Sequence, residues 1–402
     1  MFFILYHGGK HMSSKAYFAE EVRERAKELD SPEDTLCVGS VTMSSYSSSA
    51  RSNMVAQHLV QALVPNKPEV PGVATSYEEL FGAFSTSYKK TTSKLKIVKK
   101  IVKHDDYVYT LLVYNSDDDM YDIVQRKEVK NMAESYGFKY NNETIDSYDE
   151  GDVIPKKTVL YKSPCMDDDE NFMFGLNAKV VYVTSQETIE DSIVISKSFA
   201  KKFSVTKVDT CEVPFNDNDI FLNIYGDNEH YKSFPDVGEK IKDSVLCATR
   251  RKNKVLDQLY LKNSNLKKIF PNDDVFQLLG DYKVVDIDVW ANKPYDELPT
   301  APAYDQVKFY YNRMIEYYTD IYNTFGDIID KGYNYSQEFS QLYAKARDFL
   351  DPSCKYVDEE RMFSNLIVEF TLMKSEPLRR GCKLCGKYQS VHTYSNMRDY
   401  SI

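Results

Sequence analysis

Residues 188–196 carry the run Thr188-Ile189-Glu190-Asp191-Ser192-Ile193-Val194-Ile195-Ser196. Two adjacent carboxylates, Glu190 and Asp191, precede a β-branched apolar segment that predicts a strand. A helix is expected to begin near Ser196, with Phe199, Ala200 and Phe203 on one side. Burying paired carboxylates among apolar residues is costly unless a cation neutralises them. The pair is therefore either a solvated turn at a strand end or part of a metal site, and composition alone leaves both interpretations open.

A second run carries clustered positive charge: Arg379-Arg380-Gly381-Cys382-Lys383, followed by Lys387. It comes after an apolar stretch, residues 365–373, that predicts a strand. Basic residues on a glycine-containing turn after a strand can hold phosphate groups. Together with Glu190 and Asp191, this run would supply the metal ligand and the cations that phosphoryl transfer needs, because its catalysis is mostly positioning and charge neutralisation.

The CxxC motif formed by Cys382 and Cys385 offers a different chemistry. With His392 and Cys354 it could complete a zinc knuckle, but the chain has no second cysteine pair at a matching spacing. A thioredoxin-like redox site would need a βα context that the flanking residues do not predict. We therefore expect no zinc, and an unrelated zinc or redox protein is kept as an alternative.

Two acidic runs, Asp117-Asp118-Asp119 and Asp167-Asp168-Asp169-Glu170, are weaker candidates for Mg²⁺. Carboxylates bind this ion only where they converge in space. Consecutive aspartates in an extended loop cannot all face one ion, so both runs are predicted to be solvated loops.

The rest of the pattern predicts an α+β chain of several domains. Alternation with period two indicates strands, and aromatic residues at three- and four-residue steps indicate an αα-hairpin. Glycine, proline and serine clusters mark the turns and loops between these elements. The expected elements are helices at 12–32 and about 53–63, a serine-rich loop at 42–53, strands within 94–114, a β-rich region at 210–300 with turns at 225–227 and 237–239, and hairpin helices at 303–325 and 335–350.

Seven lysines, at positions 89, 90, 94, 96, 99, 100 and 103, lie in or near the first of these strands. Two interpretations are open. The lysines either cover a solvated strand face or form a wall facing nucleic-acid phosphates, where each would add a salt-dependent contact.

The composition limits the function classes. The chain has 402 residues, enough for two or three domains, and a net charge of −10 that argues against a dedicated basic nucleic-acid-binding module. Contact with nucleic acid inside a larger assembly stays possible, because such an assembly can be basic only in its channel. Seven cysteines without a framework pattern fit a reducing, cytosolic compartment. No run approaches the ~18 apolar residues of a membrane-spanning helix.

Residues 188–196 resemble the β subunit of cellular multi-subunit RNA polymerases, whose pattern is roughly Gly-Tyr-Asn-(Phe/Trp)-Glu-Asp-(Ala/Ser)-Ile-(Val/Leu)-(Ile/Val)-Ser. Further short matches follow the family's order along residues 42–388, and this collinear order carries the resemblance. Before the Glu190-Asp191 run, Arg51-Ser52-Asn53-Met54-Val55-Ala56-Gln57 resembles the family's Gly-Ser-Asn-Met-Gln-Arg-Gln, Gly151-Asp152-Val153-Ile154 resembles Gly-Asp-Val-Leu, and Asn177-Ala178-Lys179-Val180 resembles Gly-x-Asn-x-x-Val. After it, Val237-Gly238-Glu239-Lys240-Ile241 and Asp286-Ile287-Asp288-Val289 resemble strands of the family's flap. The last match is Gly381-Cys382-Lys383-Leu384-Cys385-Gly386-Lys387-Tyr388, which resembles Gly-Asp-Lys-Met-Ala-Gly-Arg-His.

The resemblance implies a role for each matched residue. Asp191, with Glu190, would lie near the Mg²⁺ that arrives with the nucleotide. Lys383 would contact the RNA 3′ end and the incoming nucleotide, and Gln57 would contact the RNA–DNA hybrid. The predicted nucleic-acid-binding set is completed by Arg51, Asn53, Arg379, Arg380 and Lys387.

The implied protein is a subunit of a DNA-directed RNA polymerase, a nucleotidyltransferase that acts only in a complex. Mg²⁺ would be shared with the β′-type subunit, since no Asp-Phe-Asp-Gly-Asp pattern is present in this chain. The expected partners are that subunit, the N-terminal part of β, the DNA template, the RNA–DNA hybrid and nucleoside triphosphates, with no membrane. Split β subunits are known in giant bacteriophages, so a phage origin and a location in the host cytoplasm are expected.

The chain also departs from the family pattern. Cys382 stands in place of an aspartate, Val391 falls where a second lysine would be, and the match stops after Tyr388. We therefore expect a split or truncated subunit, and a non-catalytic remnant or scaffold that only binds polymerase subunits is the second alternative. The predicted domains are a helical lead-in at 1–41, a fork and hybrid-binding region at 42–210, a flap-like domain with the hairpin at 211–364, a return strand and basic loop at 365–388, and a divergent tail at 389–402.

Overall fold

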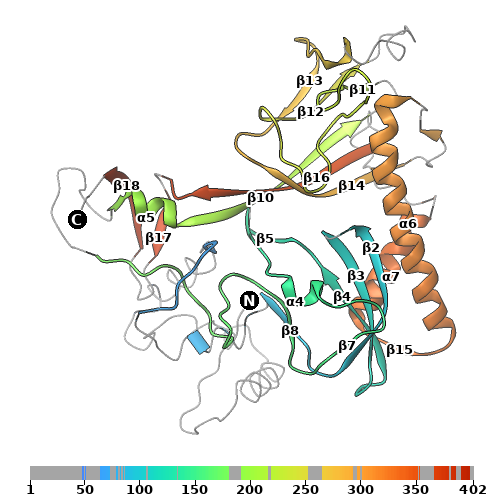
Figure 1. Ribbon diagram of the computed structural model, residues 1–402, viewed down its shortest axis with the longest axis horizontal. Coiled ribbons are helices and arrows are strands. Elements are labelled where there is room, and N and C mark those ends of the chain that lie inside the picture. Colours follow the sequence, from blue (N-terminus) through green and yellow to red (C-terminus); the bar gives the residue numbers. More distant parts are fainter. Residues whose placement is uncertain are drawn as a thin grey trace.

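Helices and strands alternate irregularly along the chain in the computed structural model, with more strand than helix (Figure 1). This mixed architecture is compatible with the predicted α+β class. Across the part of the chain that the structure describes, no helix combines the length and apolar character needed to cross a membrane. The described residues are 48, 50, 64–72, 78–79, 82, 85, 87–105, 107–133, 135–180, 192–215, 219–251, 265–292, 297–298, 301–351, 353, 366–379, 382–385 and 391–398. The predicted helices at 12–32 and 53–63 and most of the serine-rich loop lie outside them.

The strands predicted within 94–114 form an antiparallel meander. Alternate residues of its first strand, including Leu95, Ile97 and Ile101, are buried, whereas Lys96 is exposed. A register shift between Ile97 and Lys99 then moves the pattern to the other face, so that Leu95 and Ile97 pack in one apolar cluster and Ile101 in another. The sheet order is β15-β4-β3-β2-β7, with β2 (Leu95–His104), β3 (Val108–Asn115), β4 (Met120–Arg126), β7 (Val153–Ile154) and β15 (Asn334–Tyr335).

The lysines of this region divide between the two faces of the sheet. Lys103 is buried and forms ion pairs with Asp286, at 2.9 Å, and with Asp288. Three more of the seven bind carboxylates of the chain itself, in the pairs Lys90–Glu170, Lys99–Asp320 at 3.7 Å and Lys100–Asp149 at 3.0 Å. Because these charges are already paired, the structure favours a structural role over a continuous wall facing phosphates.

A second sheet contains the two longest strands of the described chain. β10 and β16 are antiparallel and paired from Ser204 opposite Pro377 to Phe215 opposite Leu366. β16, which begins at Leu366, confirms the apolar strand predicted at 365–373. The order is β14-β16-β10-β6-β5, with β5 (Val129–Ala133), β6 (Tyr136–Lys139), β10 (Ser204–Phe215), β14 (Lys283–Ala291) and β16 (Leu366–Pro377).

The β-rich region predicted at 210–300 contributes β14 and a small third sheet. The turn predicted at Val237-Gly238-Glu239 is present, and Gly238 adopts φ +93°, a conformation that favours glycine. An added Cβ there would lie 2.8 Å from the Tyr107 hydroxyl, so glycine is also required by space. The third sheet has the order β11-β12-β13, with β11 (Asp219–Phe221), β12 (Val245–Arg251) and β13 (Asp274–Gln277), and a 3₁₀ helix, η5 (Asn265–Lys267), precedes β13.

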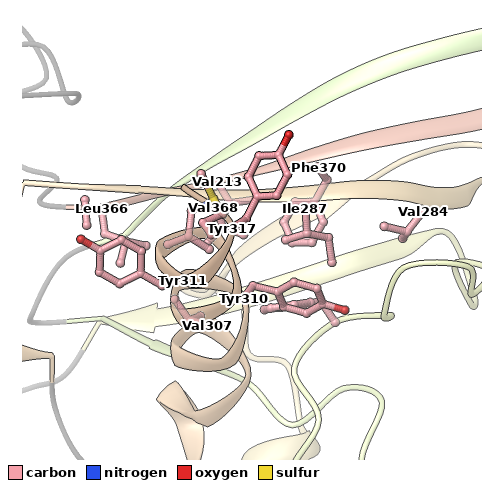
Figure 2. Packing of buried hydrophobic residues seen from close by; sticks show 14 of the residues in the cluster. Val213, Val284, Ile287, Val307, Tyr310, Tyr311, Tyr317, Leu366, Val368 and Phe370 are labelled. Atoms are coloured by element: carbon pink, nitrogen blue, oxygen red, sulfur yellow. The ribbon is translucent and has the colours of Figure 1, made fainter. Parts of the chain in front are cut away.

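The predicted αα-hairpin is confirmed by α6 (Pro302–Asp330) and α7 (Gln337–Leu350). Phe325 and Phe339 stack between the two helices with ring centroids 4.0 Å apart, and Ser336 caps α7 by accepting a hydrogen bond from the Phe339 amide. Figure 2 shows tyrosines of α6 facing apolar residues of the second sheet. The labelled residues are Val307, Tyr310, Tyr311 and Tyr317 of the helix and Val213, Val284, Ile287, Leu366, Val368 and Phe370 of the strands.

Shorter elements complete the fold. The first acidic run, Asp117 to Asp119, occupies the exposed turn between β3 and β4, and Asp168 of the second is exposed and paired with Lys162 at 2.6 Å. The prediction of solvated loops is confirmed for these residues. The shorter elements are β1 (Tyr88–Lys90), which pairs with β8 (Val159–Lys162), and α4 (Glu143–Asp146).

Candidate functional site

A three-stranded sheet joins the two runs that the sequence analysis selected. Its strands are β9 (Ser192–Ser196), β17 (Lys383–Cys385) and β18 (Val391–Arg398), in the order β17-β18-β9. β18 pairs in parallel with β9 and antiparallel with β17. Figure 1 shows this sheet and α6 at opposite ends of the molecule, with β10 and β16 running between them.

The register of this sheet fixes which residues share a row. Lys383 of β17 lies opposite Thr393 of β18, and Thr393 lies opposite Ser192 of β9. Neighbouring strands are about 4.8 Å apart, so the backbones at Lys383 and Ser192 are separated by roughly 10 Å. Ser192 directly follows Asp191 in the sequence. The fold therefore places the strand that carries one predicted site residue and the strand that begins immediately after another on either side of β18.

An apolar cluster holds this sheet together. β9 continues directly into α5 (Lys197–Lys202), and Ser196 caps the helix by accepting a hydrogen bond from the Phe199 amide at 3.2 Å. This confirms the helix predicted to begin near Ser196. The cluster consists of Ile195, Ala200 and Leu378, with Ile193, Phe199, Phe203, Cys382 and Leu384 packed against them.

The end of β16 is tied to α5 by backbone hydrogen bonds. The Leu378 amide donates to the carbonyls of Ala200, at 3.3 Å, and Phe203, at 3.1 Å. A turn follows, in which the Cys382 amide donates to the carbonyl of Arg379 at 3.2 Å. The position of β17 is thus determined by the strand before it and by the helix after β9.

The charge of Arg379, predicted to bind nucleic acid, is shared with an acidic neighbour. Its guanidinium lies 3.0 Å from the carboxylate of Glu376, which is largely buried and also pairs with Lys374 at 2.5 Å. The Arg379 side chain keeps 66% of its surface exposed. It can therefore reach an anionic ligand, but only in competition with Glu376.

The CxxC motif lies partly in an extended strand. β17 begins at Lys383 and ends at Cys385, so Cys385 lies in the strand and Cys382 directly precedes it, at the end of the turn from Arg379. The Cys382 thiol forms no disulfide within the described chain.

Most of the predicted site residues lie outside the described ranges. This applies to Glu190 and Asp191, the predicted Mg²⁺ ligands, and it also applies to Arg51, Asn53, Gln57, Arg380 and Lys387. Among the residues that the structure does describe, no three His, Cys, Asp or Glu side chains are grouped so that they could hold a metal ion. The fit of Mg²⁺ is thus decided by residues beyond those described.

Residues 389–402 are predicted from the sequence to be a divergent tail. In the structure, residues 391–398 of this tail form β18, the middle strand of the candidate site. The signal was present in Val391, Thr393 and Tyr394, which are residue types with high strand propensity. Its pairing with β9 is parallel and distant in sequence, and no local pattern predicts that.

Sequence reasoning also missed a buried charge cluster between the meander and β14. Burial opposes the charge of Lys103, but the carboxylates of Asp286 and Asp288 outweigh it and raise the pKa of Lys103. Burial likewise disfavours ionised Asp286, yet Lys103 and His104 lower its pKa. His104 contacts Asp286 at 3.0 Å. Lys103 bridges the two carboxylates of β14, so this cluster joins two sheets and is not a second candidate site.

In comparisons with known proteins, no family model matches the chain, and no curated protein sequence matches it significantly.

Proposed function

We propose that this chain is part of a β-type subunit of a DNA-directed RNA polymerase. In the assembled enzyme it would hold the RNA–DNA hybrid and the incoming nucleotide while RNA grows on a DNA template. Catalysis would require a β′-type subunit, which in this family supplies the carboxylates for the catalytic ion.

The observation that supports the proposal best is the row formed by Lys383, Thr393 and Ser192. The resemblance assigns Lys383 and Asp191 to one active centre, although a long stretch of chain separates them. A fold that kept their segments apart would have argued against this assignment. Instead, both segments belong to one three-stranded sheet.

The proposed chemistry depends on two opposite charges, the ammonium group of Lys383 and the carboxylate of Asp191. Lys383 would place an ammonium group near the RNA 3′ end and the phosphates of the nucleotide, where it offsets negative charge. Asp191, with Glu190, would help to hold Mg²⁺, which when bound neutralises charge on the triphosphate. Arg379, Arg380 and Lys387 would contact the nucleic-acid backbone near the same sheet, and Arg51, Asn53 and Gln57 would contact the hybrid.

The test is to purify the tagged chain from its native source with its partners and to measure DNA-templated RNA synthesis. The informative variants are Asp191→Ala and Lys383→Ala. Their matched controls are Asp117→Ala, in the exposed turn between β3 and β4, and Lys96→Ala, an exposed lysine of β2. Losing a charged group at such a centre typically costs a factor of about 10²–10³ in rate, and the controls should retain full synthesis.

Three results are distinguishable. Co-purifying β′-type subunits and a large loss of synthesis in both variants would support the proposal. Partners without any RNA synthesis would favour the non-catalytic scaffold. Absence of polymerase subunits from the purified material would refute both.

A further inference from the structure

A cavity of about 710 Å³ lies beside α6, away from the candidate site. Its walls come from the turn between β2 and β3, from the loop that precedes β12 and from the first turns of α6. A volume of this size is typical of sites that receive a small molecule or a large side chain.

One wall of the cavity is held rigidly by a glutamine. The Gln306 side chain accepts hydrogen bonds from the amides of Ser233, at 3.0 Å, and Phe234, at 3.2 Å. It donates to the Phe234 carbonyl and to Asp236, each at 2.8 Å. The Tyr310 hydroxyl also donates to Asp236, at 2.9 Å. The loop is therefore fixed on the helix before any ligand arrives, which lowers the entropic cost of binding.

The charges that line the cavity do not balance. Asp105 pairs with Arg313 at 3.3 Å, and Asp236 pairs with Lys232 at 2.6 Å. The third lining carboxylate, Asp305, is exposed, and within the described chain it forms no ion pair. With neutral histidines, the cavity therefore carries an excess of one negative charge.

Aromatic rings stand next to this carboxylate. Phe309, one helical turn after Asp305, is 54% exposed, so part of its ring is open to a ligand. The Arg313 guanidinium already lies 5.8 Å from the centre of the Phe309 ring, and the Lys283 ammonium lies 4.9 Å from that of Tyr107. Both rings line the cavity and lie within reach of cations, which are attracted to aromatic faces.

We propose that this cavity binds the cationic head of a basic side chain, a guanidinium or an ammonium group, presented by a partner polypeptide. Asp305 would supply the counter-charge and Phe309 the ring face. A phosphate-bearing ligand is disfavoured, because it would meet the unpaired carboxylate, while Lys232 and Arg313 are already engaged. The chain's net charge of −10 would also attract a basic partner over a longer range.

The test uses the full chain and two nearly isosteric probes, N-acetyl-arginine amide and N-acetyl-citrulline amide. Citrulline has the shape of arginine without its charge. Saturation-transfer NMR titrations should show binding of the arginine probe, with the citrulline probe at least about fivefold weaker. Asp305→Asn and Phe309→Ala should each weaken binding of the arginine probe by a similar factor.

The matched control is Asp327→Asn, which removes an exposed carboxylate of the same helix outside the cavity and should leave binding unchanged. Circular dichroism of each variant verifies that α6 is intact. Equal binding of the two probes would refute the proposal, and so would full binding by a folded Asp305→Asn variant. Binding of adenosine monophosphate without binding of the arginine probe would assign the cavity to an anionic ligand instead.

Discussion

Asp288 of β14 lies directly opposite Glu369 of β16, so two carboxylates form one cross-strand pair. Burial and the neighbouring charge of Asp286 raise the pKa of Asp288, although Lys103 opposes this. Burial and the charge of Asp288 raise the pKa of Glu369. Like charges directly opposite each other destabilise a sheet. The two carboxyls therefore bind a proton more readily in the folded chain than in the unfolded one.

The pair should therefore make stability depend on pH. Because both pKa values are higher in the folded chain than in the unfolded one, the folded chain binds more protons, and stability falls as pH rises through the folded values. Asp286, whose pKa is lowered, has the opposite effect on stability: its stabilising contribution is lost only as pH falls below the ordinary value of 3.8. Glu369→Gln should raise stability at pH 7 by about 0.2–1 kcal/mol and reduce the difference between pH 5 and pH 7. Thermal unfolding at both pH values measures this, with the exposed Glu229→Gln as control; an unchanged pH dependence in Glu369→Gln would contradict it.

Lys103 should be among the most sensitive positions in the chain. Lys103→Met leaves two buried carboxylates without their cation, which typically costs about 3–5 kcal/mol. Lys96→Met, on the exposed face of the same strand, should change stability by less than about 0.5 kcal/mol. Urea unfolding followed by fluorescence compares the two. The double variant Lys103→Met/Asp286→Asn should recover part of the loss, and a double variant no better than Lys103→Met alone would argue against this charge-based explanation.

Because β18 is the middle strand of its sheet, we expect its hydrogen bonds to protect the backbone amides of β9 from hydrogen exchange. Thr393→Pro removes a backbone donor from a strand paired on both sides, whereas Thr393→Val keeps that donor and a β-branched side chain. Hydrogen exchange measured by mass spectrometry should show faster exchange in residues 192–196 for the proline variant alone. Equal protection of β9 in both variants would mean that β18 contributes little to the sheet.

Substituting Gly151 and Gly238 by alanine distinguishes the free-energy cost of a strained backbone from that of a steric clash. Gly151 has φ +89° with no atom within 4 Å of an added Cβ, whereas Gly238 has φ +93° with Tyr107 in the way. Gly151→Ala should cost about 1 kcal/mol, and Gly238→Ala should cost at least about 1 kcal/mol more. Chemical unfolding of both variants tests the difference. In a Tyr107→Ala background the excess should disappear, and its persistence would mean that the Tyr107 contact is not its source.

The elements predicted most accurately from the sequence are those determined by neighbouring residues. The aromatic steps along α6, the start of α5 near Ser196 and the alternation in β2 each depend on contacts within a few residues or on one buried face. The burial of Lys103 could not be inferred from this alternation, because a register shift between Ile97 and Lys99 places Ile101 in a different apolar cluster from Leu95 and Ile97. The lysine positions include both parities, so they cannot all lie on one face of a strand.

The pairing of distant strands could not be predicted in this way. Nothing near Val391 indicates that residues 391–398 lie between β9 and β17, because that register depends on how the whole chain returns along β16. The same applies to Asp286 and Asp288, whose partner is in a strand far away in the sequence. Of the candidate site, local sequence predicted β9 and α5, while the row from Lys383 to Ser192 required the fold.

β16 also has a mechanical consequence. Its 12 residues span roughly 40 Å, and hydrogen-bonded partners on both sides make it stiff along its length. One end packs under α6, and the other passes directly into the turn that precedes Lys383. β16 therefore connects the helical end of the molecule to β17 through one continuous hydrogen-bonded strand, and its length sets the spacing between the two.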